Sequence, residues 1–205
     1  MLETLIRSVM AGMLIGMGCC IYASVPDHVV GSMLFAFGLM SVIQYKLCLY
    51  TGMVGLAGRG VSLKKLLLVL SGNVAGAILL WTVTAPSGLA FVPQLEAIAA
   101  AKLAARPLYG IAAAAFLCGM LMELGVSVWR SGSEAHTAKS FITVTAVMIF
   151  ILIGAEHSIA DAFYVLFSGE PLYRRAFFIL LCALGNAAGG IAANRGTSIA
   201  LRKQG

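Results

Sequence analysis

The chain has 205 residues, of which 60% are hydrophobic and only 11% are charged, and its formal net charge is +6. Soluble domains carry about 25% charged residues, so the composition excludes an ordinary soluble domain and favours a protein embedded in lipid. Nucleic-acid binding is also disfavoured, because most basic residues stand at the ends of apolar runs, as the flanks of membrane spans do.

The first half of the chain contains three apolar runs of about the 20 residues that a helix needs to cross a bilayer. They cover residues 5–25, 29–50 and 66–85. The first resembles a cleaved signal peptide only weakly, so we expect it to remain as a helix. The second run is followed by a glycine-rich stretch over residues 51–60, where we expect the helix to break.

The second half supplies three further spans. Residues 91–106 are alanine-rich and short, with Pro93 and Pro107 near the two ends, and we expect an external or interfacial helix there. Spans follow over residues 108–129, 138–167 and 176–194, and the second of these is interrupted at residues 154–158. We therefore predict an all-α membrane protein, with residues 1–205 as a single transmembrane domain of six helices, the second and fifth of them broken.

The distribution of lysine and arginine predicts the orientation. Six spans place both termini on one side, and the basic residues divide nine to four in favour of that side. The larger group is Arg7, Arg59, Lys64, Lys65, Arg130, Lys139, Arg195, Arg202 and Lys203; the smaller is Lys102, Arg106, Arg174 and Arg175. The positive-inside rule then predicts cytoplasmic termini and residence in a cell membrane.

A short segment occurs twice. Residues 71–77, around Asn73, match residues 184–190, around Asn186, and a disturbed helix precedes each copy. Two units of three helices must be inverted relative to each other in the membrane. Interrupted helices at matching positions of inverted repeats indicate a transport site.

The interruption at residues 154–158 concentrates polar groups within an apolar stretch. His157 stands beside Glu156 and near Asp161, and ionisable residues at membrane depth usually face a cavity or a partner. A second half-helix that begins near Ser158 would offer amide donors to an anion. A purely structural role for His157, as a helix cap, is equally compatible with the sequence, and Thr51 could either hydrogen-bond to His157 or cap its own loop.

Two further charges and the cysteines complete the list of candidates. Lys46 and Glu123 fall within spans and could form a buried or intersubunit pair, or Lys46 could extend to the interface. All the cysteines lie in or beside apolar runs, without the spacing of metal ligands, so we expect no metal, disulfide or cofactor.

Several motifs, in the same order along the chain, resemble those of the formate/nitrite transporter family. Residues 154–163 resemble its Gly-Phe-Glu-His-Ser-Val/Ile-Ala-Asn-Met-Phe signature, and residues 49–52 its Leu-Phe-Thr-Gly/Ser loop. Residues 35–39 resemble the pore-lining segment before that loop, and residues 138–141 its Asp-Lys-Ala-Phe segment. Residues 72–77 and 185–190 resemble its two Gly-Asn helices.

The resemblance implies an aquaporin-like fold and a homopentamer with a pore in each protomer. It would place His157 and Thr51 at the pore centre. Phe35 and Leu39 would form one apolar constriction and Phe150 the other, Leu49 and Tyr50 would belong to a gating loop, and Lys139 would attract anions to a vestibule. The chain departs from the family pattern in having Ala155 for Phe and Asp161 for Asn, and Glu123 lies near an Asn expected on the fourth helix.

The sequence and the resemblance together predict a channel or transporter for a small monovalent anion or its weak acid, in the class of formate, nitrite and hydrosulfide, with protons as possible partners. His157 would be its hydrogen-bond or proton donor. The alternative is an aquaporin-like channel for a neutral solute, although the chain lacks two Asn-Pro-Ala motifs. A membrane enzyme that uses Glu156 and His157 is disfavoured, because adjacent residues diverge on a helix and no nucleophile or metal set accompanies them.

Overall fold

The computed structural model describes residues 1–104, 106–130 and 135–202, and these residues form helices and no named strand. Lys203, which the orientation count included, lies outside the described residues. The helices in chain order are α1 (Leu2–Ser24), α2 (His28–Gln44), α3 (Tyr50–Met53), η1 (Val54–Leu56), α4 (Leu63–Thr84), η2 (Ala85–Ser87), α5 (Val92–Ala104), α6 (Leu108–Ser127), α7 (His136–Leu152), α8 (Ser158–Tyr164), η3 (Val165–Phe167) and α9 (Leu172–Arg202).

Four helical segments are long and apolar enough to cross a membrane: Leu2–Ser24, Leu63–Ser87, Leu108–Ser127 and Leu172–Leu201. The segments His28–Gln44, His136–Leu152 and Ser158–Phe167 are apolar but shorter. The last helix runs beyond the predicted end at residue 194. Thr197 and Ser198 there donate their hydroxyl hydrogens to carbonyl oxygens one turn back, so these polar side chains continue the helix.

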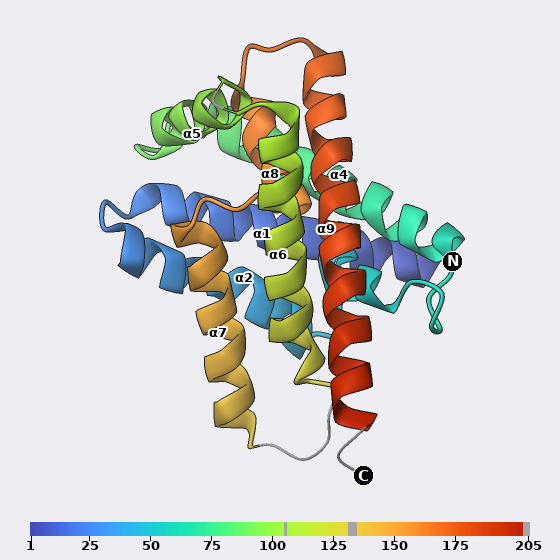
Figure 1. Cartoon of the computed structure of the whole chain (residues 1–205). Helices are drawn as coiled ribbons and strands as arrows, with labels where there is room; N and C mark the ends of the chain where they lie inside the picture. Colours follow the sequence, from blue (N-terminus) through green and yellow to red (C-terminus); the bar gives the residue numbers. More distant parts are fainter. Residues whose placement is uncertain (105, 131–134, 203–205) are drawn as a thin grey trace.

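Two helix pairs hold the bundle together, α1 with α4 and α6 with α9. In Figure 1, α6, α7 and α9 run down the picture and α1, α2 and α4 lie across it. Glycine permits the close approach in both pairs. A Cβ atom on Gly12 would collide with the backbone of Asn73, and a Cβ atom on Gly119 with the backbone of Asn186. The two contacts are equivalent, as the repeated Gly-Asn segment leads one to expect.

Both broken helices end in the same hydrogen-bond pattern. In α2 the Lys46 amide donates to Ile43 O and the Leu47 amide to Val42 O. At the end of α7 the Gly154 amide donates to Ile151 O and the Ala155 amide to Phe150 O. This is the Schellman motif, in which one residue takes left-handed backbone angles. The residue is Lys46 (φ 51°) in the first helix and Gly154 (φ 66°) in the second.

The first break therefore lies earlier than predicted. The helix that was expected to reach residue 50 ends at Gln44, and residues 45–49 are not helical. Three apolar residues, Leu47, Cys48 and Leu49, conceal this break in a hydropathy pattern. The second break was predicted at residues 154–158, and the structure places it at residues 153–157, just before α8.

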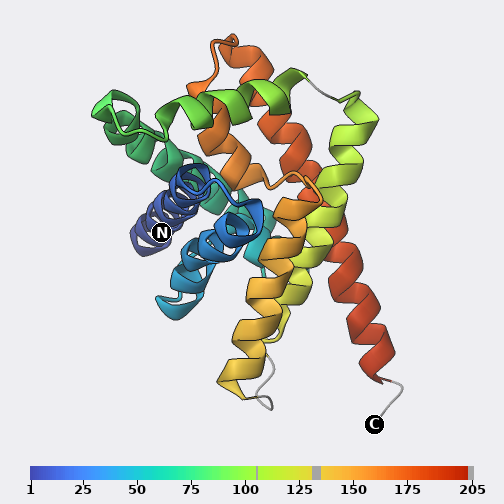
Figure 2. The same ribbon diagram turned by 90° about the vertical axis from the view of Figure 1, so that its left-hand side faces the viewer.

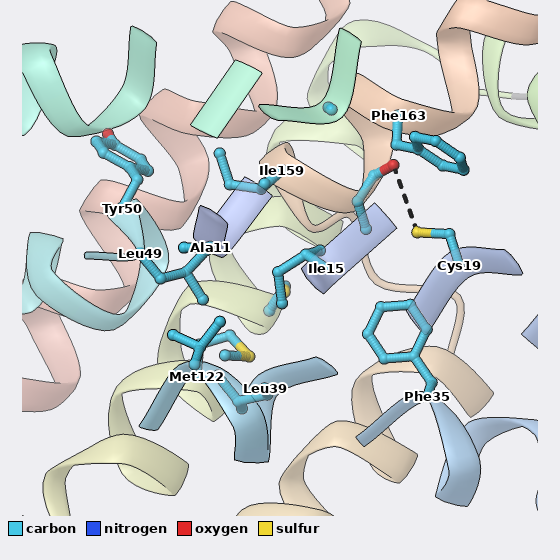
Figure 3. Close-up of a cluster of buried hydrophobic side chains, with 14 of the residues drawn as sticks. Ala11, Ile15, Cys19, Phe35, Leu39, Leu49, Tyr50, Met122, Ile159 and Phe163 are labelled. Carbon is cyan, nitrogen blue, oxygen red and sulfur yellow. Dashed lines mark hydrogen bonds between the residues drawn. The ribbon is translucent and has the colours of Figure 1, made fainter. Parts of the chain in front are cut away.

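The side chains at the centre of the bundle come from both breaks. In the close-up of Figure 3, Ile15 of α1 lies between Ile159 of α8 and Leu39 of α2. Leu49, next to the first break, belongs to the same buried cluster, as does Phe163 of α8. The half-helix α8 thus packs against α1, whereas α3 packs against α4 and α6, and both half-helices contribute side chains to the hydrophobic core.

The connecting segment between the two helix pairs contains α5, the short helix predicted over residues 91–106. It lies across one end of the bundle (Figure 2) and contacts α1, α8 and η3. This position brings its side chains over the second break.

Replacing Lys46 by glycine is expected to stabilise the protein. A non-glycine residue with left-handed backbone angles costs about 1–2 kcal/mol, part of which glycine loses again through the entropy of its unfolded chain. We expect Lys46→Gly to raise the free energy of unfolding by about 1 kcal/mol and to raise the melting temperature in detergent. Lys64→Gly, in the ordinary helical backbone of α4, is the control and should lower it. A lower melting temperature for Lys46→Gly would contradict the prediction.

Candidate functional site

Two fully buried asparagines complete the backbone hydrogen bonds of the two breaks. Asn73 on α4 accepts a hydrogen bond from the amide of Tyr50 (2.8 Å) and donates to the carbonyls of Ser8 (2.8 Å) and Cys48 (2.9 Å). Asn186 on α9 accepts from the amide of Ser158 (2.9 Å). Its amide group donates to the carbonyls of Ala115 and Glu156, both at 2.8 Å. Each asparagine therefore joins the start of a half-helix to a long helix.

His157 and Thr51, from the two breaks, meet in a buried hydrogen bond of 3.0 Å between Nε2 and Oγ1. The other ring nitrogen, Nδ1, accepts from the amide of Ala160 at 3.1 Å and so caps α8. An acceptor nitrogen carries no hydrogen, so neutral His157 must carry its hydrogen on Nε2 and donate it to Thr51. His157 therefore caps α8 and also contacts a partner, Thr51, so the two roles that the sequence left open for His157 occur together.

Two phenylalanines cover His157. The Phe150 ring stacks on the imidazole with ring centroids 5.5 Å apart, and the Phe35 ring meets Phe150 edge-on at 5.9 Å. Phe35, Phe150 and His157 line one cavity, whereas Leu39 lines another with Leu49. Phe35 and Leu39 stand on the same helix, α2, which passes both cavities, and the constriction expected of them stays a prediction.

The cavity beside His157 has a volume of about 320 Å³ and a charged wall. Lys102 of α5 forms ion pairs with Glu156 Oε2 and, at 2.7 Å, with Asp161 Oδ1. Arg106 contacts Glu156 Oε1 at 3.4 Å and donates to the carbonyl of Gly154 at 2.8 Å. Two cations thus balance two carboxylates that are almost completely buried.

The sequence did not indicate that Lys102 belongs to this site, and Lys102 was considered only as a charge outside the membrane spans. Burial alone would lower the pKa of its ammonium group, but Asp161 and Glu156 outweigh burial and hold the pKa above the usual lysine range. One signal was available. Two acidic residues at membrane depth require a basic partner, and α5 offers the adjacent cations.

Within the described ranges, no cluster of three or more His, Cys, Asp or Glu side chains could hold a metal ion. The five cysteines are all free thiols, and four of them are buried.

A family model described as "Formate/nitrite transporter" matches residues 1–197 of the chain. The chain belongs to the formate/nitrite transporter family. No curated protein sequence matches it. Two solved structures show the same fold: an "FNT family ion channel", with 22% identity and a TM-score of 0.82 over 97% of this chain and 90% of that one, and a "Pentameric formate channel with formate bound", with 21% identity and a TM-score of 0.81 over 99% and 97%.

In this family member, a second ion pair, between Arg130 and Glu123, lies beside the half-helix α3 that follows the first break. Arg130 donates to Glu123 Oε1 on α6 and to the carbonyl of Gly52, both at 2.6 Å. Asn194 on α9 donates to Glu123 Oε1 at 2.8 Å. Glu123 therefore pairs with Arg130, and the pair between Glu123 and Lys46 that the sequence allowed is not formed; the Lys46 side chain is exposed.

The remaining predicted residues lie around these contacts. Tyr50 donates its hydroxyl hydrogen to the carbonyl of Ala183 (3.1 Å), and Leu49 is buried beside it. Lys139 is buried at the start of α7 and lines neither of the two cavities described above. The hydroxyl oxygen of Ser158 has no hydrogen-bond partner among the described residues.

Replacing Asn186 by leucine should destabilise the protein strongly. The change removes the Asn186 partner of the Ser158 amide and of the Glu156 carbonyl, both at the break, and each unsatisfied buried group costs about 1–3 kcal/mol. We expect a large fall in the melting temperature in detergent. Asn194→Leu is the control, and it should cost less: its two contacts are with Glu123 and Arg59, and these side chains keep Arg130 and Ser198 as partners. Equal melting temperatures for the two variants would contradict this account of Asn186.

Replacing Arg130 by methionine should loosen the Thr51 segment. The variant leaves the Glu123 carboxylate buried without its cation, a change that costs about 3 kcal/mol when a buried pair is broken. It also frees the carbonyl of Gly52, next to Thr51. We expect faster amide hydrogen exchange over residues 50–56, with residues 158–164 unchanged. Unchanged exchange in both segments would show that Arg130 does not hold the loop. Arg174→Met, which removes an exposed pair with Glu170, is the control.

Proposed function

We propose that this chain is a channel or transporter for a small monovalent anion or its conjugate weak acid, in the class of formate, nitrite and hydrosulfide. The observation that carries the proposal is the position of the His157–Thr51 hydrogen bond. His157 lines one cavity, and Leu49 and Gly52, close to Thr51, line the other. Cargo moving between the two cavities would pass this contact. Family membership and a structural relative described as holding formate support the same class of cargo.

The ring of His157 would offer cargo a hydrogen bond from Nε2–H. A ring that gives up a proton and ends neutral must first carry hydrogen on both nitrogens, and Nδ1–H could not accept from the Ala160 amide. Donation of a hydrogen bond therefore requires no change at the cap of α8, whereas donation of a proton does. Thr51, the current acceptor, would be the group that cargo replaces.

The apolar side chains would control hydration. The phenyl rings of Phe35 and Phe150 on one side of the contact, and Leu39 and Leu49 on the other, offer no groups that could replace the water around an ion. A fully hydrated ion is thereby rejected, because losing its water there is costly. In this proposal Tyr50 belongs to the loop that gates the cavity lined by Leu39 and Leu49. Lys139 attracts anions to the same end of the pathway.

The proposed architecture is six membrane helices in two inverted repeats, with α2–α3 and α7–α8 as the broken helices. The paired roles of Asn73 and Asn186 and the paired Schellman motifs support it. We further propose a homopentamer, as in the pentameric relative, with both termini in the cytoplasm and a pore rather than a catalytic site in each protomer.

The test is flux of formate, nitrite and hydrosulfide into proteoliposomes. For His157→Ala we expect a loss of at least about tenfold, since a missing buried hydrogen-bond partner costs 1–3 kcal/mol and 1.4 kcal/mol is a factor of ten. His157→Asn retains a capping acceptor and an N–H donor, so it should transport faster than the alanine variant. His136→Ala, an exposed histidine, is the control and should match the wild type.

Two outcomes would oppose the proposal. Unchanged flux in His157→Ala would remove the histidine from the pathway. Swelling with water or a small neutral solute, in the absence of flux of any of the three anions, would favour the aquaporin-like alternative instead.

A further inference from the structure

Asp161 places a buried acceptor in the wall of the His157 cavity. It lies one helical turn after His157 on α8, so both side chains share one face of that half-helix and both line the cavity. Asp161 is 1% exposed. An ionised carboxylate accepts up to about four hydrogen bonds, so its surroundings should supply several donors.

The surroundings supply too few donors. Oδ1 has the Lys102 ammonium at 2.7 Å as an ionic partner. Neither Asp161 oxygen accepts a hydrogen bond of ordinary geometry from the described residues, and Oδ2 has no ionic partner among them either. Lys102 compensates Oδ1, so Oδ2 is the buried acceptor without a partner in the described part of the chain, and a molecule that enters the cavity with a donatable hydrogen would remove the cost of leaving it unpaired.

The charge of the wall leads to the same class of ligand. Lys102 and Arg106 are balanced by Glu156 and Asp161, so the four side chains together carry no net charge. If residue 161 were an amide, as in the family signature that residues 154–163 resemble, the same group would carry one excess positive charge. Asp161 thus removes the excess charge that would draw an obligate anion into this cavity.

We propose that Asp161 is a specificity-determining residue that selects cargo bearing a donatable hydrogen. The class comprises small uncharged weak acids and hydrides with an O–H or S–H group, such as formic acid or hydrogen sulfide. Asp161 accepts the hydrogen bond from that group, and His157 Nε2–H donates to another atom of the cargo. The inference rests on the proposed function and narrows the cargo class at the same site.

The experiment compares formate with nitrate in proteoliposomes at one pH. The two anions are similar in size, but nitrate is the anion of a strong acid and acquires no hydrogen near neutral pH. We expect wild type to carry nitrate at least about tenfold more slowly than formate, the factor that 1.4 kcal/mol of discrimination produces. We expect Asp161→Asn to raise the ratio of nitrate flux to formate flux by about tenfold, because it restores one excess positive charge to the wall.

The control is Asp27→Asn. Asp27 caps α2 and is not among the residues that line the cavity, and asparagine caps equally well, so the ratio should stay at the wild-type value. Asp161→Ser is a second, smaller variant, and size-exclusion profiles establish that each variant is folded. Should both Asp161 variants fail to fold, the wild-type ratio alone decides the matter, since equal rates of nitrate and formate overturn the inference.

The outcomes separate this inference from the proposed function. Wild type that carries none of formate, nitrite and hydrosulfide refutes the proposed function. Wild type that carries formate, with a nitrate ratio that Asp161→Asn leaves unchanged, refutes the role of Asp161 alone.

Discussion

Unpaired backbone groups are the constraint on which the rest of this structure depends. A helix that breaks at membrane depth exposes amides and carbonyls, and hydrocarbon offers them no partner. Here Asn73 and Asn186 each satisfy one amide and one carbonyl at a break, and each also donates to a carbonyl of a neighbouring long helix. The breaks persist because these amide side chains reach them, and the side chains reach them because glycines bring the long helices into contact.

The polar contact at the centre follows from this scaffold. Once Asn186 fixes the start of α8, His157 is the residue before the helix, where it both caps α8 and turns its other nitrogen towards Thr51. The Arg130–Glu123 pair fixes the opposite segment by holding the carbonyl next to Thr51. Neither break alone would define the contact, because each supplies one of its two atoms.

The sequence predicted the parts of the fold that a periodic or local pattern encodes. The apolar runs, the second break and the repeated Gly-Asn segment all follow from short-range features, and residues 154–163 identified His157. The predicted end of the second helix at residue 50 was wrong. The helix ends at Gln44 because Lys46 takes left-handed backbone angles, and the apolar residues that follow hide this end in the sequence. The partners of Glu156 and Glu123 could not be chosen, since several cations were available and only the packing of α5 and α6 selects Lys102 and Arg130.

The position of Lys102 also limits how the chain can vary. Lys102 lies on the segment that connects the two helix pairs, so no symmetric duplication of a three-helix unit would produce it. Its ammonium group nevertheless forms ion pairs with two carboxylates, Glu156 and Asp161, that come after α6 and α7 in the sequence. A neutral residue at position 102 would leave an excess buried negative charge unless Glu156 or Asp161 changed as well. A change at position 102 is therefore tolerated only together with a change at position 156 or 161, although Lys102 and Glu156 are 54 positions apart in the sequence.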